Sequence, residues 1–344
     1  MPPGRTARRD GPIAALTDCT GMRASTHPVA ELLRTRRDEG STPGARRDPH
    51  RVALVLEGGG MRGVVSAGMT AAVERLGFTA SFDLVVGSSA GALNGAGLLG
   101  GVALEGPAVY CGPLASRQFI NPARLLIGRP AMDVGFVLGH ASANLDRDRH
   151  ERTVSSVAPL IAVAVDVDTA DLVTFAGMRT KEELWAVLLA TTRMPLFGGR
   201  PVEIDGRRYV DGALAAPVPL DTALEAGATH ALVLQTRPYG VPRSTGSRVA
   251  ERLIERHLRR LNPALERLWR ERAVSYEHLV ADIARRSTAP GDEPPHVLGL
   301  RPPAGTPVVG QLERRPPVLT RAAAAAEQLV EEALGPRPAD SEAA

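Results

Sequence analysis

The sequence of 344 residues is poor in four features, and each shortage excludes a class of protein. Its two cysteines, Cys19 and Cys111, are too few for a disulfide framework or a cysteine-rich metal site. No apolar run approaches about 18 residues, so no helix is expected to span a bilayer. Aromatic residues make up only 3%, and no basic run is interleaved with them, which argues against nucleic-acid binding. The N-terminal arginines precede no apolar segment of the secretory type, so we expect a reducing, cytoplasmic location.

Aliphatic residues are abundant, and they set the size of the core. Hydrophobic residues reach 44%, enough for one large domain or two small ones. The 41 basic residues, nearly all arginine, exceed the 38 acidic residues only slightly, which is compatible with peripheral contact to an anionic membrane. We expect a flexible arm over residues 1–50, because they are rich in Arg, Ser, Thr, Pro and Gly. A single folded domain is expected over 51–335 and a flexible tail over 336–344.

The order of the elements predicts an α/β fold. Residues 52–56 form a short β-rich apolar run, as expected of a strand buried on both faces, and a glycine-rich segment ends it. A helix over 64–76, a strand over 82–86 and a helix over 90–99 follow. Further strands are expected at 160–166, 172–175, 202–204, 207–210, 231–235 and 297–300, and further helices at 181–190, 219–226, 247–286 (broken at Pro263) and 322–334. This alternation predicts a three-layer sandwich with a mainly parallel central sheet.

A glycine-rich motif follows the first predicted strand. It consists of Gly58, Gly59, Gly60, Met61, Arg62 and Gly63. Glycines allow a tight turn that presents backbone N–H groups, and the N-terminus of the next helix favours negative charge. The motif also fits the GxGxxG pattern of dinucleotide-binding turns, which require an acidic residue just after the second strand. Gly87, Ser88 and Ser89 occupy that place, and Asp83 lies at the start of the strand, so a nucleotide is disfavoured.

Ser89 is the central residue of a second motif, Gly87-Ser88-Ser89-Ala90-Gly91. This GxSxG sequence lies between a predicted strand and a predicted helix, the setting of a nucleophile elbow. The sharp turn of an elbow requires small neighbours, which Gly87 and Gly91 supply. The N-terminus of the helix favours a developing alkoxide on Ser89. An ordinary serine–glycine turn remains the alternative when this motif is considered alone.

Asp211, Gly212 and Ala213 form the third motif, after the predicted strand that ends in Tyr209-Val210. An isolated Asp-Gly at a strand end is often only a turn or a helix cap. Its interest comes from the other two motifs, because a serine hydroxyl needs a base and its tetrahedral intermediate needs hydrogen-bond donors. We expect all three motifs at the C-terminal ends of strands, which gather at one edge of a parallel sheet.

Together the three motifs resemble those of the patatin-like phospholipase family. Gly58–Gly63 resembles its glycine-rich oxyanion loop, Gly87–Gly91 its nucleophile elbow, and Asp211-Gly212-Ala213 its Asp-Gly-Ala/Gly motif, in the same order. The segment Thr192-Arg193-Met194-Pro195 also resembles the one before the family's aspartate. The resemblance extends from about Val52 to the strand at 231–235, and more loosely to the C-terminal helix.

The resemblance implies a lipid acyl hydrolase with a Ser–Asp dyad, no catalytic histidine, no metal and no other cofactor. Ser89 would become acylated. Asp211 would take its proton, return it to the leaving alcohol and then activate water. Amides of the Gly59–Met61 stretch would bind the oxyanion, and Arg62 would shape or charge the loop. The implied partner is a lipid or other acyl ester, whose head group and chain length stay open.

Other interpretations remain open at this point. A Ser-His-Asp hydrolase is permitted by chain order, because His230, His257, His278 and His296 all follow Asp211. Against it, the glycine-rich motif follows the first strand and lacks a leading histidine. The motifs could also persist in a protein that only binds its ligand. The apolar stretch over 119–138 is expected either to line or cover an acyl pocket or to pack in the core.

Overall fold

The fold is taken from a computed structural model, in which residues 24–136, 139, 147–242 and 248–336 are described. In that part of the chain, eight strands form one sheet in the order β5-β6-β3-β2-β1-β7-β8, with β4 also paired to β3. The strands are β1 (Val52–Leu56), β2 (Leu84–Ser88), β3 (Leu160–Asp166), β4 (Leu172–Phe175), β5 (Val202–Ile204), β6 (Arg207–Asp211), β7 (His230–Leu234) and β8 (His296–Leu300). The neighbouring strands β3, β2, β1, β7 and β8 run parallel to one another, whereas β4, β5 and β6 pair in antiparallel fashion. The mainly parallel sheet is therefore as predicted.

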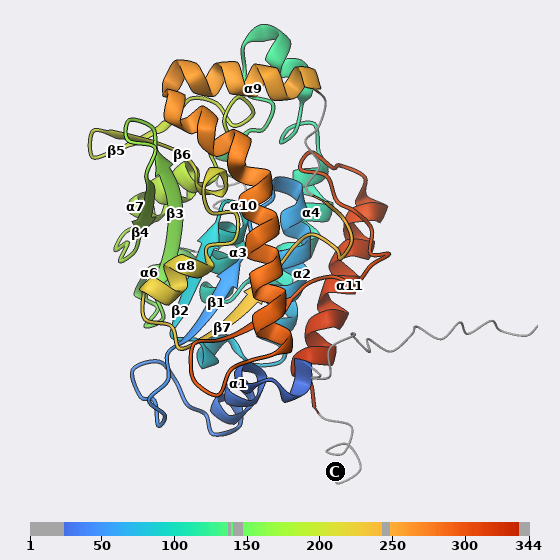
Figure 1. The fold of residues 1–344 in the computed structure, drawn as a ribbon. Coiled ribbons are helices and arrows are strands. Elements are labelled where there is room, and N and C mark those ends of the chain that lie inside the picture. Colours follow the sequence, from blue (N-terminus) through green and yellow to red (C-terminus); the bar gives the residue numbers. More distant parts are fainter. Residues whose placement is uncertain (1–23, 137–138, 140–146, 243–247, 337–344) are drawn as a thin grey trace, which may run out of the picture.

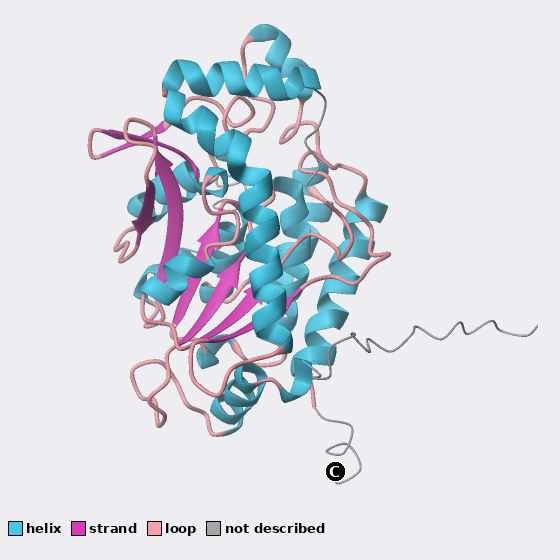
Figure 2. Ribbon diagram, viewed as in Figure 1, coloured by secondary structure: helices cyan, strands magenta, loops and turns pink. Residues whose placement is uncertain are grey.

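Helices cover both faces of this sheet (Figures 1 and 2). Along β1, Leu54 and Leu56 belong to one buried cluster, and Ala53 and Val55 to a second one on the opposite face, as the two-residue period of a strand requires. The first cluster includes residues of α1 (Pro28–Asp38), α2 (Gly63–Arg75), α3 (Ala90–Leu99), α4 (Gly106–Cys111), α7 (Lys181–Thr191) and α11 (Pro316–Leu334). The second includes residues of α8 (Leu220–Glu225) and α10 (Pro263–Thr288). The three-layer α/β sandwich is confirmed.

Two further helices complete the described fold. The helix α9 (Arg248–Leu261) lies across the top of the view in Figure 1 and packs on α10 through Ile254 and Leu258. The shorter helix α6 (Arg147–Ser155) packs on α3 and α7. The predicted break at Pro263 is confirmed, because α10 begins there. The helix predicted at 322–334 begins earlier, at Pro316.

Close packing of α2 on α11 depends on one glycine. A Cβ atom at Gly68 would lie 2.5 Å from the carbonyl oxygen of Ala323. Any side chain there would push the two helices apart, because backbone cannot give way as a flexible side chain can. Glycine at this position thereby allows α2 to pack closely on the C-terminal helix α11.

The N-terminal region differs from the predicted arm. Residues 28–38 form α1, whose Val29, Ala30 and Leu33 are fully buried in the core. The Arg36 side chain is 1% exposed and pairs with Asp48 and Asp83, at 2.7 Å each. Arginines surround the short apolar patch of α1 in the sequence. The ion pairs of Arg36 offset the cost of burying its charge. Residues 1–23 and 337–344 lie outside the described residues, so the predictions made for them stay predictions.

No helix within the described ranges combines the length and the apolar character needed to cross a bilayer.

Candidate active site

Ser89 lies in a strained turn between β2 and α3. Its backbone has φ 53° and ψ −126°, a region that non-glycine residues rarely occupy. The Ser89 amide donates to the Thr191 hydroxyl at 2.9 Å, which in turn donates to the Val163 carbonyl at 2.6 Å. Neighbouring backbone leaves no room beside the turn: a Cβ at Gly91 would lie 2.4 Å from the Leu56 carbonyl oxygen. Strain that the surroundings hold in this way is characteristic of functional sites.

The side chains of Ser89 and Asp211 meet. Ser89 Oγ donates to Asp211 Oδ2 at 2.8 Å, and the two residues are 4% and 3% exposed. The other carboxylate oxygen, Oδ1, accepts the amide of Ala213 at 2.8 Å. A Cβ at Gly212 would lie 2.2 Å from the carbonyl oxygen of Val163, so only glycine lets the backbone after Asp211 approach β3 this closely. The carboxylate is therefore fixed in orientation, with one oxygen directed at the serine.

The direction of the strand that carries Asp211 differs from the prediction. We expected it at the C-terminal end of a parallel strand, but β6 runs antiparallel to β3. Because β3 extends beyond the end of β2, β6 pairs with this extension and runs back toward the serine. Asp211 lies opposite Ala164, and Ser88 lies opposite Val163, the preceding residue of β3. The pairing register of one strand, rather than a shared strand direction, thus brings the two motifs together.

The glycine-rich loop passes directly over Ser89. A Cβ at Gly58 would lie 2.7 Å from the Ser88 carbonyl oxygen and 3.0 Å from Ser89 Cβ. Four of the six amides of the loop are already engaged within the protein. Their acceptors are Pro217 O for Gly58, Gln311 O for Met61, Gly59 O for Arg62 and Gly60 O for Gly63.

Two amides of the loop remain, those of Gly59 and Gly60, for which the described residues offer no acceptor. Met61 belongs to the stretch whose amides were expected to bind the oxyanion, and its amide donates to the Gln311 carbonyl at 3.0 Å. The oxyanion role of Gly59 and Gly60 stays a prediction.

Arg62 holds the loop through a buried polar network that the sequence did not predict. Its Nε donates to the Thr236 hydroxyl at 3.0 Å, and its guanidinium lies 3.8 Å from the fully buried Glu57 carboxylate. Glu57 also accepts the Tyr276 hydroxyl at 3.0 Å and the Thr236 amide at 2.5 Å. Burial lowers the pKa of Arg62 and raises that of Tyr276. Glu57 follows directly after a buried strand, and this position was the one feature of the sequence that could have indicated a role for it.

The cavity above Ser89 has a volume of only about 20 Å³. Its lining includes Ser89, Asp211, Met194, Arg237 and Gln311. This space admits about one water molecule. A molecule larger than water can therefore occupy this space only after some of the lining residues move.

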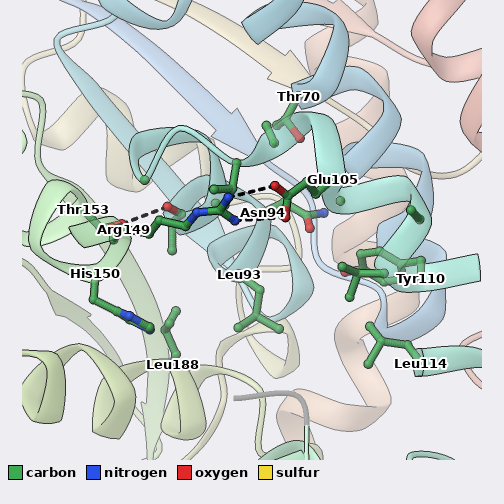
Figure 3. Close-up of a pocket in the computed structure, with 18 of the residues that line it drawn as sticks. Thr70, Leu93, Asn94, Glu105, Tyr110, Leu114, Arg149, His150, Thr153 and Leu188 are labelled. Carbon is green, nitrogen blue, oxygen red and sulfur yellow. Dashed lines mark hydrogen bonds and ion pairs between the residues drawn. The ribbon is translucent and has the colours of Figure 1, made fainter. Parts of the chain in front are cut away.

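A second cavity, of about 470 Å³, lies between α3, α4, α6 and α7 (Figure 3). None of the described residues of the apolar stretch at 119–138 lines this cavity or the one above Ser89. Phe119 and Ile120 are instead core residues, and Leu126 and Ile127 are 88% and 69% exposed. Val137 and Leu138 lie outside the described residues. The expectation that this stretch lines an acyl pocket finds no support in these two cavities.

The four histidines that follow Asp211 lie on other elements than Ser89 and Asp211. His230 and His296 begin β7 and β8, at the edge of the sheet opposite Ser89, and their rings pack together with centroids 5.0 Å apart. His257 and His278 are on α9 and α10. The described residues include no group of three or more His, Cys, Asp or Glu side chains placed to hold a metal. The Ser89 hydroxyl donates to a carboxylate, which disfavours the Ser-His-Asp alternative.

Comparison with known proteins places this fold and these motifs in one family. Residues 54–224 match the family model described as patatin-like phospholipase, a segment that contains all three motifs. The chain belongs to the patatin-like phospholipase family. The matched segment ends before β7, short of the extent that the sequence suggested.

The relatives and solved structures found are only partly similar. The Escherichia coli (strain K12) protein named "Uncharacterized protein YjjU" is 29% identical over 192 residues, 55% of this chain and 53% of the relative. The match thus spans about half the length of that relative. VipD from Legionella pneumophila covers 83% of this chain and 67% of its own, with 12% identity and a TM-score of 0.36. Human GIVD cytosolic phospholipase A2 covers 43% and 24%, with 17% identity and a TM-score of 0.24. At these TM-scores neither structural likeness carries an argument.

Proposed function

We propose that the protein is a lipid acyl hydrolase in which Ser89 is the nucleophile and Asp211 is its base. The observation that carries this proposal is the 2.8 Å hydrogen bond from Ser89 Oγ to Asp211 Oδ2, buried beneath a glycine-rich loop. A serine hydroxyl is a weak nucleophile until an adjacent base accepts its proton. Membership in the patatin-like phospholipase family supports an acyl ester of a lipid as the substrate.

The first half of the reaction forms an acyl-enzyme. Asp211 Oδ2 accepts the Ser89 proton as Oγ attacks the ester carbonyl, and the carbonyl oxygen becomes an oxyanion. The amides of Gly59 and Gly60 are the donors offered to that oxyanion. The intermediate then collapses, the bond to the alcohol breaks, and the alcohol leaves with the proton held by Asp211.

The second half returns the enzyme to its starting state. Asp211 accepts a proton from water, whose oxygen attacks the acyl carbonyl. Collapse of this second intermediate releases the fatty acid, and the proton returns to Ser89 Oγ. The hydrogen bond from the Ala213 amide to Oδ1 keeps Oδ2 directed at the reacting oxygen in both halves.

Substitution of the two dyad residues tests this proposal. We expect Ser89→Ala and Asp211→Asn each to lower kcat/KM for a chromogenic acyl ester by at least about 10³-fold, because neither residue can act without the other. Both variants should keep the circular dichroism spectrum of the wild type, since each change is nearly isosteric. Substantial turnover by either folded variant would rule out the assigned roles.

Ser88→Ala is the matched control. Its hydroxyl is buried one residue before the nucleophile, and no hydrogen-bond partner for it is present among the described residues. Its removal should leave kcat/KM close to that of the wild type. A loss as large as that of Ser89→Ala would mean that damage to the turn, rather than loss of the nucleophile, explains the effect.

A further inference from the structure

The 470 Å³ cavity adjoins the helix that carries Ser89 at its start. Leu93, Ala96, Gly97 and Gly100 line it, and these positions follow Ser89 at helical spacings of four, seven, eight and eleven residues. Residues at such spacings share one face of a helix. The cavity therefore follows one face of α3, from one turn beyond Ser89 to the end of the helix, roughly 16 Å from the serine along its axis.

The opposite wall comes from the other helix that holds Ser89 in place. Thr191, which accepts the Ser89 amide at 2.9 Å, is the last residue of α7. Leu188 and Leu184 lie three and seven residues earlier on α7, and both line the cavity. Figure 3 shows Leu188 and Leu93 directed into the same space. The walls of the cavity are thus direct continuations of the two elements that position the nucleophile.

The chemistry of the lining matches a hydrocarbon chain. Besides the leucines of α3 and α7, the walls include Val109, Tyr110 and Leu114. A volume of 470 Å³ is within the range of small-molecule sites. The charged residues that line the cavity include Arg149 and Glu105, which neutralise each other through two 2.9 Å hydrogen bonds. This pair lies at the C-terminal end of α3, where a Cβ at Gly100 would be 3.1 Å from the Arg149 carbonyl oxygen.

We propose that this cavity binds the acyl chain of the substrate and that Gly97 sets how long a chain it accepts. The proposal rests on the proposed function and names the place where the acyl group lies while it is bound to Ser89. No described residue lines both this cavity and the one above Ser89, so the proposal requires side chains between the two cavities to move when a chain enters.

Gly97 offers a way to fill the cavity without disturbing the core. A Cβ at this position would meet only Val102 Cγ2, at 3.8 Å, which is ordinary van der Waals contact. By contrast, a Cβ at Gly95, two residues earlier, would lie 2.9 Å from Val85 Cγ1. A larger side chain at Gly97 therefore extends into the cavity, and glycine-to-leucine replacement within a helix also favours the helical state.

The experiment compares hydrolysis of p-nitrophenyl dodecanoate and p-nitrophenyl butyrate by the wild type, Gly97→Ala and Gly97→Leu. The ratio of kcat/KM for the long ester to that for the short ester should fall slightly in Gly97→Ala and at least tenfold in Gly97→Leu. Gly291→Leu is the control, because Gly291 is exposed, its φ is not left-handed, and it lies outside both cavities. Its ratio should equal that of the wild type. An unchanged ratio in a folded Gly97→Leu protein overturns the proposal.

A binding measurement separates this inference from the proposed function. Fluorescence of cis-parinaric acid is followed with the Ser89→Ala protein, with and without Gly97→Leu, and the probe is displaced by dodecanoate or butyrate. Binding that dodecanoate displaces better than butyrate, and that Gly97→Leu weakens at least tenfold, supports the acyl cavity even if the wild type hydrolyses no ester. Ester hydrolysis together with fatty-acid binding that Gly97→Leu leaves unchanged overturns the cavity assignment and leaves the hydrolase standing.

Discussion

The two edges of the central sheet are built on different principles. At the edge that carries Ser89, the backbone is in very close contact with itself: the Ser89 φ is positive, and side chains larger than hydrogen are excluded at Gly58, Gly91 and Gly212. At the opposite edge, where α1 lies beside the starts of the strands in Figure 1, charged and aromatic side chains connect the residues around those starts. Arg36 alone donates to Asp48, Asp83 and the carbonyl oxygens of Ser81 and His50, at 2.7 to 2.9 Å.

The difference between the two edges separates contacts that position side chains and amides from contacts that stabilise the fold. Glycine contacts at the Ser89 edge add little burial, but they fix where the hydroxyl, the carboxylate and the amides lie. Ion pairs and buried rings at the α1 edge have no reacting group nearby, so they act on the free energy of unfolding. Perturbing one edge should therefore change activity, and perturbing the other should change stability.

Gly212→Ala is the strongest test of the Ser89 edge. The added Cβ would lie 2.2 Å from the Val163 carbonyl oxygen, so the backbone must shift and carry Asp211 with it. Displacement of a catalytic group by about 1 Å costs about 10²-fold in rate, and we expect at least that loss in kcat/KM. Steady-state assays on the folded variant measure it, with Gly291→Ala as the control in an exposed loop. Activity close to that of the wild type would show that the dyad tolerates misplacement.

Arg36→Ala is the corresponding test of the α1 edge. Removing one member of a buried charge cluster leaves its partners unpaired, and because Asp48 and Asp83 are partly exposed we expect a loss of about 3 kcal/mol in the free energy of unfolding. Denaturant titration measures this loss. Arg321→Ala, on the exposed side of α11, should change stability by less than about 0.5 kcal/mol.

Activity separates the two edges in the same variant. The folded fraction of Arg36→Ala should hydrolyse ester at the rate of the wild type, because no residue around Arg36 lines the cavity above Ser89. A large loss of kcat without loss of stability would contradict the division of roles between the edges.

Sequence reasoning found the residues of the Ser89 edge but not how they are arranged. Apolar runs identify β1 and β3 because both are buried on both faces, and the spacing of small residues identifies the turn at Ser89. The direction of β6 escaped prediction, because nothing within the hairpin at 202–211 encodes which strand it pairs with. Which amides of the glycine-rich loop are hydrogen-bonded could not be predicted for a similar reason. The Gln311 carbonyl that accepts the Met61 amide comes from a distant part of the chain.

At the α1 edge the sequence was misleading. Arginines near Val29 and Leu33 are typical of a solvated arm, and their burial depends on acidic partners that lie beyond the helix itself, such as Asp83. The large cavity also has no sequence signature. It arises because small residues of α3 face leucines of α7, and only the folded structure determines that these two faces meet.

The smallest expected effect concerns the pH dependence of stability, and it belongs to the α1 edge. Burial lowers the pKa of His27 to about 4, and burial together with the neighbouring His50 and His296 lowers the pKa of His230 to about 4. Both residues are therefore neutral in the folded protein, whereas in the unfolded chain they titrate near 6.5. Between these two values the unfolded chain binds more protons, so stability is complete above about pH 6.5 and falls as the pH drops toward 4.

Between pH 7.5 and pH 5.5 this linkage should lower the free energy of unfolding by about 1 kcal/mol per histidine. Denaturant titrations at the two pH values measure the difference for the wild type and for a His27→Gln/His230→Gln variant. The difference should shrink in the variant, because glutamine takes up no proton in either state, and it should persist in His278→Gln, whose ring is exposed on α10. Equal stability of the wild type at both pH values would mean that the buried rings are protonated as easily as those of the unfolded chain. The α1 edge would then owe its stability to the Arg36 ion pairs and the core contacts of α1, without a contribution from these histidines.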